Sequence, residues 1–256
     1  MSFVEVRDVE KSYGARTIIA NVNLDVNEGA FISVVGASGC GKSTFLRLML
    51  AQEMPTKGEI RVAGADPVKE PGLDRGIVFQ RYSVFPHMTV RDNIVAGESF
   101  SANLIGRFFG TRLREARERA QEVLDRIGLG HMAKAYPSAL SGGMQQRLAI
   151  AQALIDKPKL LLLDEPFGAL DPGTRLSMHN FLEDLRTETK MTVFMVTHDL
   201  EEAFKLGDRV VVFDKPTWDV EDPDMIAATI TYDFDARDGG IPFQTMLEET
   251  NVFRAE

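Results

Sequence analysis

Alternating and continuous apolar stretches along the chain predict a sheet built from two kinds of strand. Residues 3–6 and 18–26 alternate between apolar and polar side chains, which is typical of strands in an antiparallel sheet. Residues 31–35 are almost continuously apolar and end at Gly36, as expected of a buried parallel strand. Further core strands of this second kind are predicted at residues 160–163, 193–196 and 210–213.

A block of helices is predicted between these strands. Apolar residues fall at helical spacing over residues 113–127, and Gly128 is placed to cap the C-terminus of that helix. A second helix is predicted over residues 142–156, and a third opens at Asp171-Pro172, an N-cap followed by proline at the first helical position. The order of strands, helices and strands predicts an α/β fold whose sheet is interrupted by a helical subdomain.

Composition and charge narrow the class of protein. The chain has 256 residues, long enough for one large α/β domain or two small ones. Its 29 Lys and Arg against 38 Asp and Glu give a net charge of −9, so we expect no nucleic-acid partner, because such binding relies on cations that neutralise phosphates. Cys40 is the only cysteine, which excludes an intrachain disulfide and fits a reducing compartment.

The chain contains no sequence that predicts a membrane anchor. Its first residues lack the basic start and apolar core of a signal peptide. No stretch approaches the roughly 18 apolar residues that a membrane-spanning helix needs. We therefore expect a cytoplasmic protein, and a role at a membrane would require spanning helices from other chains.

A glycine-rich segment directly after the strand at 31–35 matches the P-loop pattern for binding phosphate. Its glycines let successive backbone N–H groups turn towards one anion, and the following helix adds its N-terminal dipole. Lys42 is predicted to reach the β- and γ-phosphates of ATP, and the Ser43 hydroxyl to bind Mg²⁺. Cys40 would be inert if buried and reactive if exposed. The predicted nucleotide contacts are Gly36, Ala37, Ser38, Gly39, Cys40, Gly41, Lys42, Ser43 and Thr44.

Two acids follow the apolar strand predicted at residues 160–163. Asp164 is predicted to hold Mg²⁺ directly or through water, and Glu165 to polarise the water that attacks the γ-phosphate. Such a pair is also common where a strand simply ends in polar residues. The P-loop upstream favours the ATPase interpretation.

The chain resembles the ATPase subunits of ABC transporters. The resemblance is carried by Leu140-Ser-Gly-Gly-Met-Gln-Gln-Arg147, which is similar to the family signature and lies just upstream of the acidic strand. In that family two subunits pair head to tail, and each ATP is held by the P-loop of one and the signature of the other. The resemblance thus implies a homodimer in which Ser141, Gly142 and Gly143 bind the partner's ATP.

The resemblance assigns roles to four further residues, in the family's order along the chain. Tyr13 corresponds to the aromatic residue that stacks on adenine. Gln80 corresponds to the loop glutamine that contacts Mg²⁺ and water and senses the membrane partner. Asp171 belongs to the loop that crosses the dimer interface, and His198 to the position that contacts the γ-phosphate. The implied catalytic set is Glu165, His198, Gln80 and Lys42, and the implied metal ligands are Ser43, Gln80 and Asp164.

The resemblance also implies an architecture. It predicts one nucleotide-binding domain over 1–256, with a RecA-like P-loop core and an N-terminal antiparallel β subdomain at about 1–88 and 157–214. The α-helical subdomain is expected at about 89–156 and a short C-terminal extension at 215–256. In that extension, residues 227–234 alternate as a strand does. The apolar segment 98–112 is interpreted as a satellite core, with a partner surface as the alternative.

The function implied is ATP-driven solute import. The chain is most similar to ATPases of nitrate, sulfonate and taurine importers, which implies a subunit on the inner face of the membrane with two permease subunits. A periplasmic or surface solute-binding protein would act through the permease. The partner docking site is expected near Gln80, at residues 81–86. An importer for another solute class, an exporter and a soluble non-transport ABC ATPase are the alternatives.

Overall fold

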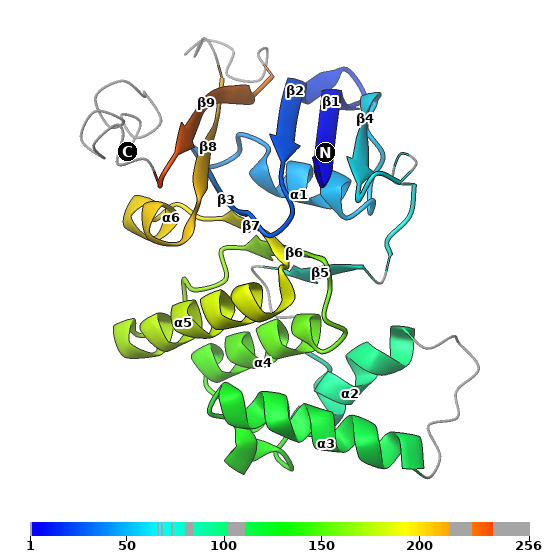
Figure 1. The fold of residues 1–256 in the computed structure, drawn as a ribbon, viewed down its shortest axis with the longest axis vertical. Coiled ribbons are helices and arrows are strands. Elements are labelled where there is room, and N and C mark those ends of the chain that lie inside the picture. Colours follow the sequence, from blue (N-terminus) through cyan, green and yellow to red (C-terminus); the bar gives the residue numbers. More distant parts are fainter. Residues whose placement is uncertain are drawn as a thin grey trace. The chain divides into compact units, whose positions relative to one another are not determined.

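The computed structural model describes residues 2–65, 67, 69–72, 74–79, 84–101, 111–215 and 227–237 (Figure 1). Its contacts divide the chain into two compact units. The first unit combines residues 1–72 with 192–256, and the second is formed by residues 73–191. The predicted nucleotide-contact and catalytic residues are shared between the units, and each unit is described in turn.

The N-terminal part of the first unit is a three-stranded antiparallel sheet. Strands β1 (Val4–Tyr13), β2 (Arg16–Val26) and β4 (Lys57–Val62) lie in the order β2-β1-β4. Val4 and Val6 are buried with Glu5 more exposed between them, so the alternation reflects a sheet with one covered face. The predicted antiparallel sheet is confirmed, and β1 extends beyond the predicted strand as far as Tyr13.

The rest of the first unit is built on buried parallel strands. Strand β3 (Phe31–Val35) pairs in parallel with both β7 (Thr192–Val196) and β8 (Arg209–Asp214). All residues of β3 and β7 are buried, which explains why neither shows polar alternation. Helix α1 (Lys42–Met49) follows β3, and helix α6 (Leu200–Leu206) follows β7.

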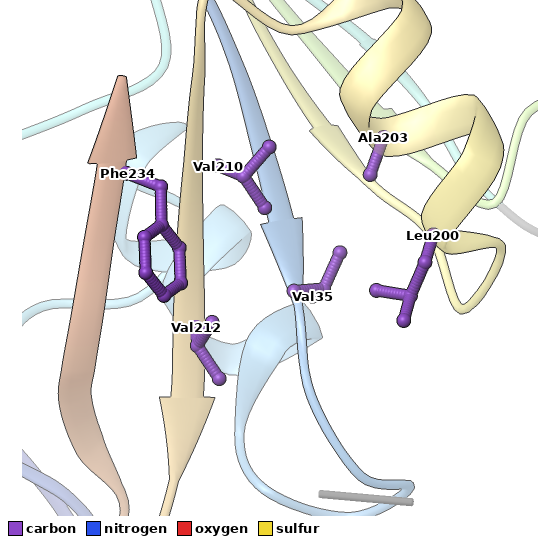
Figure 2. Packing of buried hydrophobic residues seen from close by; sticks show 6 residues of the cluster. All are labelled: Val35, Leu200, Ala203, Val210, Val212 and Phe234. Carbon is purple, nitrogen blue, oxygen red and sulfur yellow. The ribbon is translucent and has the colours of Figure 1, made fainter. Parts of the chain in front are cut away.

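The strand predicted in the C-terminal extension is confirmed as β9 (Thr229–Asp235), which pairs antiparallel with β8. Phe234 of β9 packs into a core shared with β3, β8 and α6 (Figure 2). This core contains the last residue of β3, immediately before Gly36, and the first residue of α6, two positions after His198. Its buried members are Val35, Leu200, Ala203, Val210, Val212 and Phe234.

The second unit has a parallel strand pair interrupted by helices; the helical insertion and the strand at 160–163 were predicted, whereas β5 was not. Strands β5 (Arg75–Val78) and β6 (Leu160–Asp164) pair in parallel. Between them lie α2 (Val90–Ser101), α3 (Thr111–Arg126), α4 (Gly142–Leu154) and two 3₁₀ turns, η1 (Gly130–Met132) and η2 (Pro137–Ala139); α5 (Pro172–Thr189) follows β6. Gly128 adopts the left-handed conformation of a C-terminal cap, with a φ of 71°.

The α/β class with a helical insertion is therefore confirmed. Helix α4 ends at Leu154, two residues before the predicted end. Residues 102–110 of the apolar segment 98–112 lie outside the described residues, and so do Gln80 and residues 81–83 of the expected docking site at 81–86. No helix in the described part of the chain is long and apolar enough to cross a membrane. The predicted domain boundaries stay a prediction.

Candidate nucleotide-binding and catalytic site

The loop between β3 and α1 needs glycine at two positions. Gly36 has a φ of 151°, and a Cβ added there would lie 2.1 Å from the backbone oxygen of Phe213. Gly41 has a φ of 90°, and its Cβ would lie 2.5 Å from Cγ2 of Ile19. Any other residue at these positions would clash and strain the backbone. The glycines of the P-loop pattern are therefore explained by the shape of the loop.

Lys42 is folded onto the loop that carries it. Its side chain is only 9% exposed, and Nζ donates hydrogen bonds to the backbone oxygens of Gly36 at 2.7 Å and Ala37 at 2.8 Å. Gly41 is the N-cap of α1 and supplies no side-chain cap, and the first turn of the helix contains no acid. The N–H groups at the start of α1 are thus left for an external anion, which the helix dipole favours.

Of the two possibilities for Cys40, buried and inert or exposed and reactive, the structure shows the first. Its side chain is 4% exposed, and its sulfur lies 3.8 Å from Nζ of Lys42. Burial raises the pKa of the Cys40 thiol above its usual value, and the nearby Lys42 only partly opposes this. A thiol that stays protonated and covered is a poor nucleophile.

His198 lies on a turn that is fixed by hydrogen bonds on both sides of it. It is exposed directly after β7, while its neighbour Thr197 is buried and donates from Oγ1 to the buried carboxylate of Glu202 at 2.8 Å. Asp199 caps α6 by accepting from the backbone N–H of Glu202 at 3.0 Å. The imidazole is therefore held at the surface by an anchored backbone.

Tyr13 presents a half-exposed ring beside the loop. Its side chain is 44% exposed, its hydroxyl donates to Glu53, and Nζ of Lys11 lies 5.0 Å from the ring centroid. Lys11 also pairs with Glu53 at 3.2 Å. Partial burial and the hydrogen bond to Glu53 raise the pKa of Tyr13, so the phenol remains a donor; the side chain of Thr44, at the end of the loop, opposes this rise to a smaller extent. The contact of Glu53 with Tyr13 was not predicted, because no motif or periodic spacing in the sequence marks Glu53.

In the second unit the two predicted acids emerge where β6 ends. Asp164 is its last residue, and both Asp164 and Glu165 are half-buried. Glu165 has a φ of 49°, a left-handed conformation that non-glycine residues adopt at a cost. Its backbone oxygen accepts a hydrogen bond from Nε2 of Gln146 on α4 at 3.3 Å.

The signature residues open α4 and face solvent. Ser141 is the N-cap, and its Oγ accepts from the backbone N–H of Met144 at 3.3 Å. Ser141 and Gly142 are exposed and Gly143 is half-buried. Asp171 similarly caps α5, accepting from the N–H of Thr174 at 3.0 Å, and this bonding lowers the pKa of its exposed carboxyl.

The predicted site residues thus fall into two groups. The first unit holds Tyr13, residues 36–44 and His198. The second unit holds Ser141, Gly142, Gly143, Asp164, Glu165 and Asp171. Gln80 lies outside the described residues. Gln146 was not singled out from the sequence, because it lies in the polar run Gln145-Gln146-Arg147 and only its burial distinguishes it.

Comparison with known proteins gives the family. The family model for ABC transporters matches residues 19–168. A nitrate import ATP-binding protein of Synechocystis sp. is 44% identical over 82% of this chain and 77% of its own length. An aliphatic sulfonates import ATP-binding protein of Burkholderia lata is 42% identical over 83% of this chain, and the match spans 61% of that relative.

A solved structure agrees with these matches. The ATP-binding cassette MJ0796, in a dimeric post-hydrolysis state bound to ADP and Pi, is 31% identical, with a TM-score of 0.77. The similarity covers 91% of this chain and 99% of that one. With the P-loop and the acidic strand end described above, these matches show that the chain belongs to the ABC transporter family and is an ATPase of that family.

Proposed function

We propose that the chain is the ATP-hydrolysing subunit of an importer for a small anion such as nitrate, a sulfonate or taurine. The observation that carries the proposal is its similarity, at 44% and 42% identity, to two ATP-binding proteins named for nitrate and sulfonate import. Both named solutes are small oxyanions. The loop around Lys42, with its two hydrogen bonds from Nζ, supports the proposal as the site where such a subunit would bind nucleotide.

Each predicted metal ligand within the described residues carries the donor that Mg²⁺ prefers. Ser43 offers a hydroxyl at the start of α1, and Asp164 offers a carboxylate at the end of β6. Mg²⁺ binds oxygen ligands and usually shares them with substrate phosphates. When bound with ATP, the ion would neutralise charge on the phosphates. Gln80 is the third predicted ligand.

The proposed reaction is the in-line attack of water on the γ-phosphate, giving ADP and phosphate. Glu165 orients or deprotonates the water. Lys42 leaves the carbonyl oxygens that it now contacts and, with His198, stabilises charge developing on the phosphate. Tyr13 offers a ring face to adenine.

We propose that a second copy of the chain completes each ATP site. The exposed N-terminus of α4 and the exposed Asp171 support this, because these polar groups would be covered by the partner's bound nucleotide and surface. The dimeric state of the cassette MJ0796 supports it too. ATP binding would close the dimer and hydrolysis would open it, so motion is the output passed to the membrane subunits.

The permease subunits are proposed to dock on the helical part of the second unit. A pocket of about 440 Å³ opens there, lined by both apolar and polar side chains. The buried Asn93 anchors the segment that carries several of the lining residues: its amide Nδ2 donates to the backbone oxygens of Phe85, Met88 and Thr89 at 3.0–3.2 Å. The lining residues are His87, Met88, Thr89, Asp92, Val95, Ala96, Leu113 and Tyr136.

The experiment is reconstitution of the chain with its permease and solute-binding protein in vesicles. We expect ATP hydrolysis to rise when the binding protein carries nitrate, a sulfonate or taurine. Met88→Asp should abolish that stimulation and co-purification with the permease, and leave basal hydrolysis unchanged. The control Lys134→Asp introduces the same side chain at an exposed position outside the pocket. If none of these anions stimulates hydrolysis, the proposed substrate class is wrong. If the chain associates with no permease, the proposed role in transport is wrong.

A further inference from the structure

A buried glutamine on α4 contacts the backbone of the proposed catalytic acid. Gln146 is 3% exposed, and its Nε2 donates to the carbonyl oxygen of Glu165 at 3.3 Å. Glu165 is held in a left-handed conformation, with a φ of 49°. A non-glycine residue keeps such a conformation only where its surroundings enforce it. The hydrogen bond from Gln146 is one such constraint, because it holds the carbonyl group of Glu165 itself.

Stability alone does not explain an amide at this position. Gln146 lies on a helix whose other buried residues are apolar, and its Oε1 is buried with no hydrogen-bond partner within the described residues. A buried acceptor without a donor lowers stability, whereas an apolar side chain of similar size would carry no such penalty. Local conflicts of this kind are expected where a residue serves function.

Helix α4 connects this contact to the signature. Gln146 is five residues after Ser141, the N-cap of the same helix, so the two are about 7.5 Å apart along a rigid helical axis. We infer that Gln146 is a positioning residue: it fixes the backbone of Glu165 and ties it to the helix whose N-terminus binds the partner's ATP. Nucleotide bound at the signature would then act on the base of the same chain. The inference rests on the proposed function, because it concerns hydrolysis by Glu165.

The test compares Gln146→Met with Gln152→Met in the full chain. Methionine keeps the size of the side chain and removes the amide. Gln152 is half-buried on the same helix and serves as the matched control. We expect Gln146→Met to lower kcat about tenfold, as small misplacements of catalytic groups do. The dissociation constant of a fluorescent ATP analogue should stay within about twofold. The unfolding temperature should be unchanged or higher, because the unpaired acceptor is gone.

The outcomes are distinguishable. An unchanged kcat in a folded Gln146→Met chain overturns the inference. If that variant does not fold, Gln146→Asn decides by the same measurements, since its shorter side chain keeps the amide but does not reach Glu165. If the wild-type chain and Glu165→Gln hydrolyse ATP equally well, the proposed role of Glu165 fails and the inference fails with it.

Discussion

The phosphate loop and the signature segment are both turns at the N-terminus of a helix, yet they are built differently. In the phosphate loop, Lys42 is buried and bonded to two loop carbonyls, and the glycines are fixed by close contacts. In the signature segment, Ser141 and Gly142 are exposed. The turn is held by the capping bond to Ser141 and by the side chain of Gln145, whose Nε2 donates to the backbone oxygens of Pro137 and Leu140.

This difference separates binding from turnover. The first region is complete within its own unit, so it should bind nucleotide in a single chain. The second region presents its polar groups to solvent, and Glu165, in the same unit, has a left-handed backbone conformation. We therefore expect damage to the first region to abolish binding, and damage to the second to abolish hydrolysis while binding survives.

The largest expected effect is from Lys42→Ala. It removes the buried cation that is proposed to meet the phosphates, and a loss of turnover of about a thousandfold is expected, with ATP binding lost as well. ATP hydrolysis and binding of a fluorescent analogue measure the two effects. Lys205→Ala removes an exposed lysine from α6 of the same unit and should behave as wild type. Normal ATP affinity in a folded Lys42→Ala chain would contradict the self-contained binding site.

Glu165→Gln should separate the two regions. The amide keeps the shape of the side chain but does not accept a proton, so turnover should fall roughly a hundredfold or more. ATP binding at the phosphate loop should be retained, and a dimer should accumulate with ATP, as measured by size-exclusion chromatography with light scattering. Near-normal turnover would show that another group is the base.

A smaller effect is expected at the edge of the first region. Tyr13→Ala removes the ring beside the loop and should weaken ATP binding about tenfold, since stacking of an aromatic ring on a base contributes on the order of 1–3 kcal/mol. Tyr13→Phe loses only the hydrogen bond to Glu53 and should retain most of the affinity. Equal affinities for all three chains, measured with the fluorescent analogue, would remove Tyr13 from the site.

Features that depend on neighbours in the sequence were predicted well. The apolar run of β3, the glycines after it and the cap Asp171 follow from local rules, and the structure bears out these elements. That Ser141 caps α4 is seen in the structure. The resemblance to the family supplied the role of the signature, which no local rule gives.

Features that depend on packing between distant segments were not predicted. Glu53 reaches Tyr13 from forty residues away, and Gln146 reaches Glu165 from another element. Neither contact leaves a periodic or spaced pattern, because Glu53 lies between elements and Gln146 lies in a run of polar residues, Gln145-Gln146-Arg147, in which nothing sets it apart. The hydrogen bond from Lys42 to the backbone oxygen of Gly36 was likewise not predictable, because it depends on how the loop folds in space.

The most direct test of the two-chain site is complementation between two inactive variants. Lys42→Ala disables the phosphate loop, and Gly142→Asp places a carboxylate where the signature is proposed to bind phosphate, at a helix N-terminus that tolerates an acid. In an equal mixture, half of the dimers are mixed and each mixed dimer has one intact site, so the mixture should recover at most about a quarter of wild-type ATP hydrolysis. If the mixture hydrolyses no more ATP than either variant alone, although mixed dimers form, each chain does not complete its partner's site and the account is wrong.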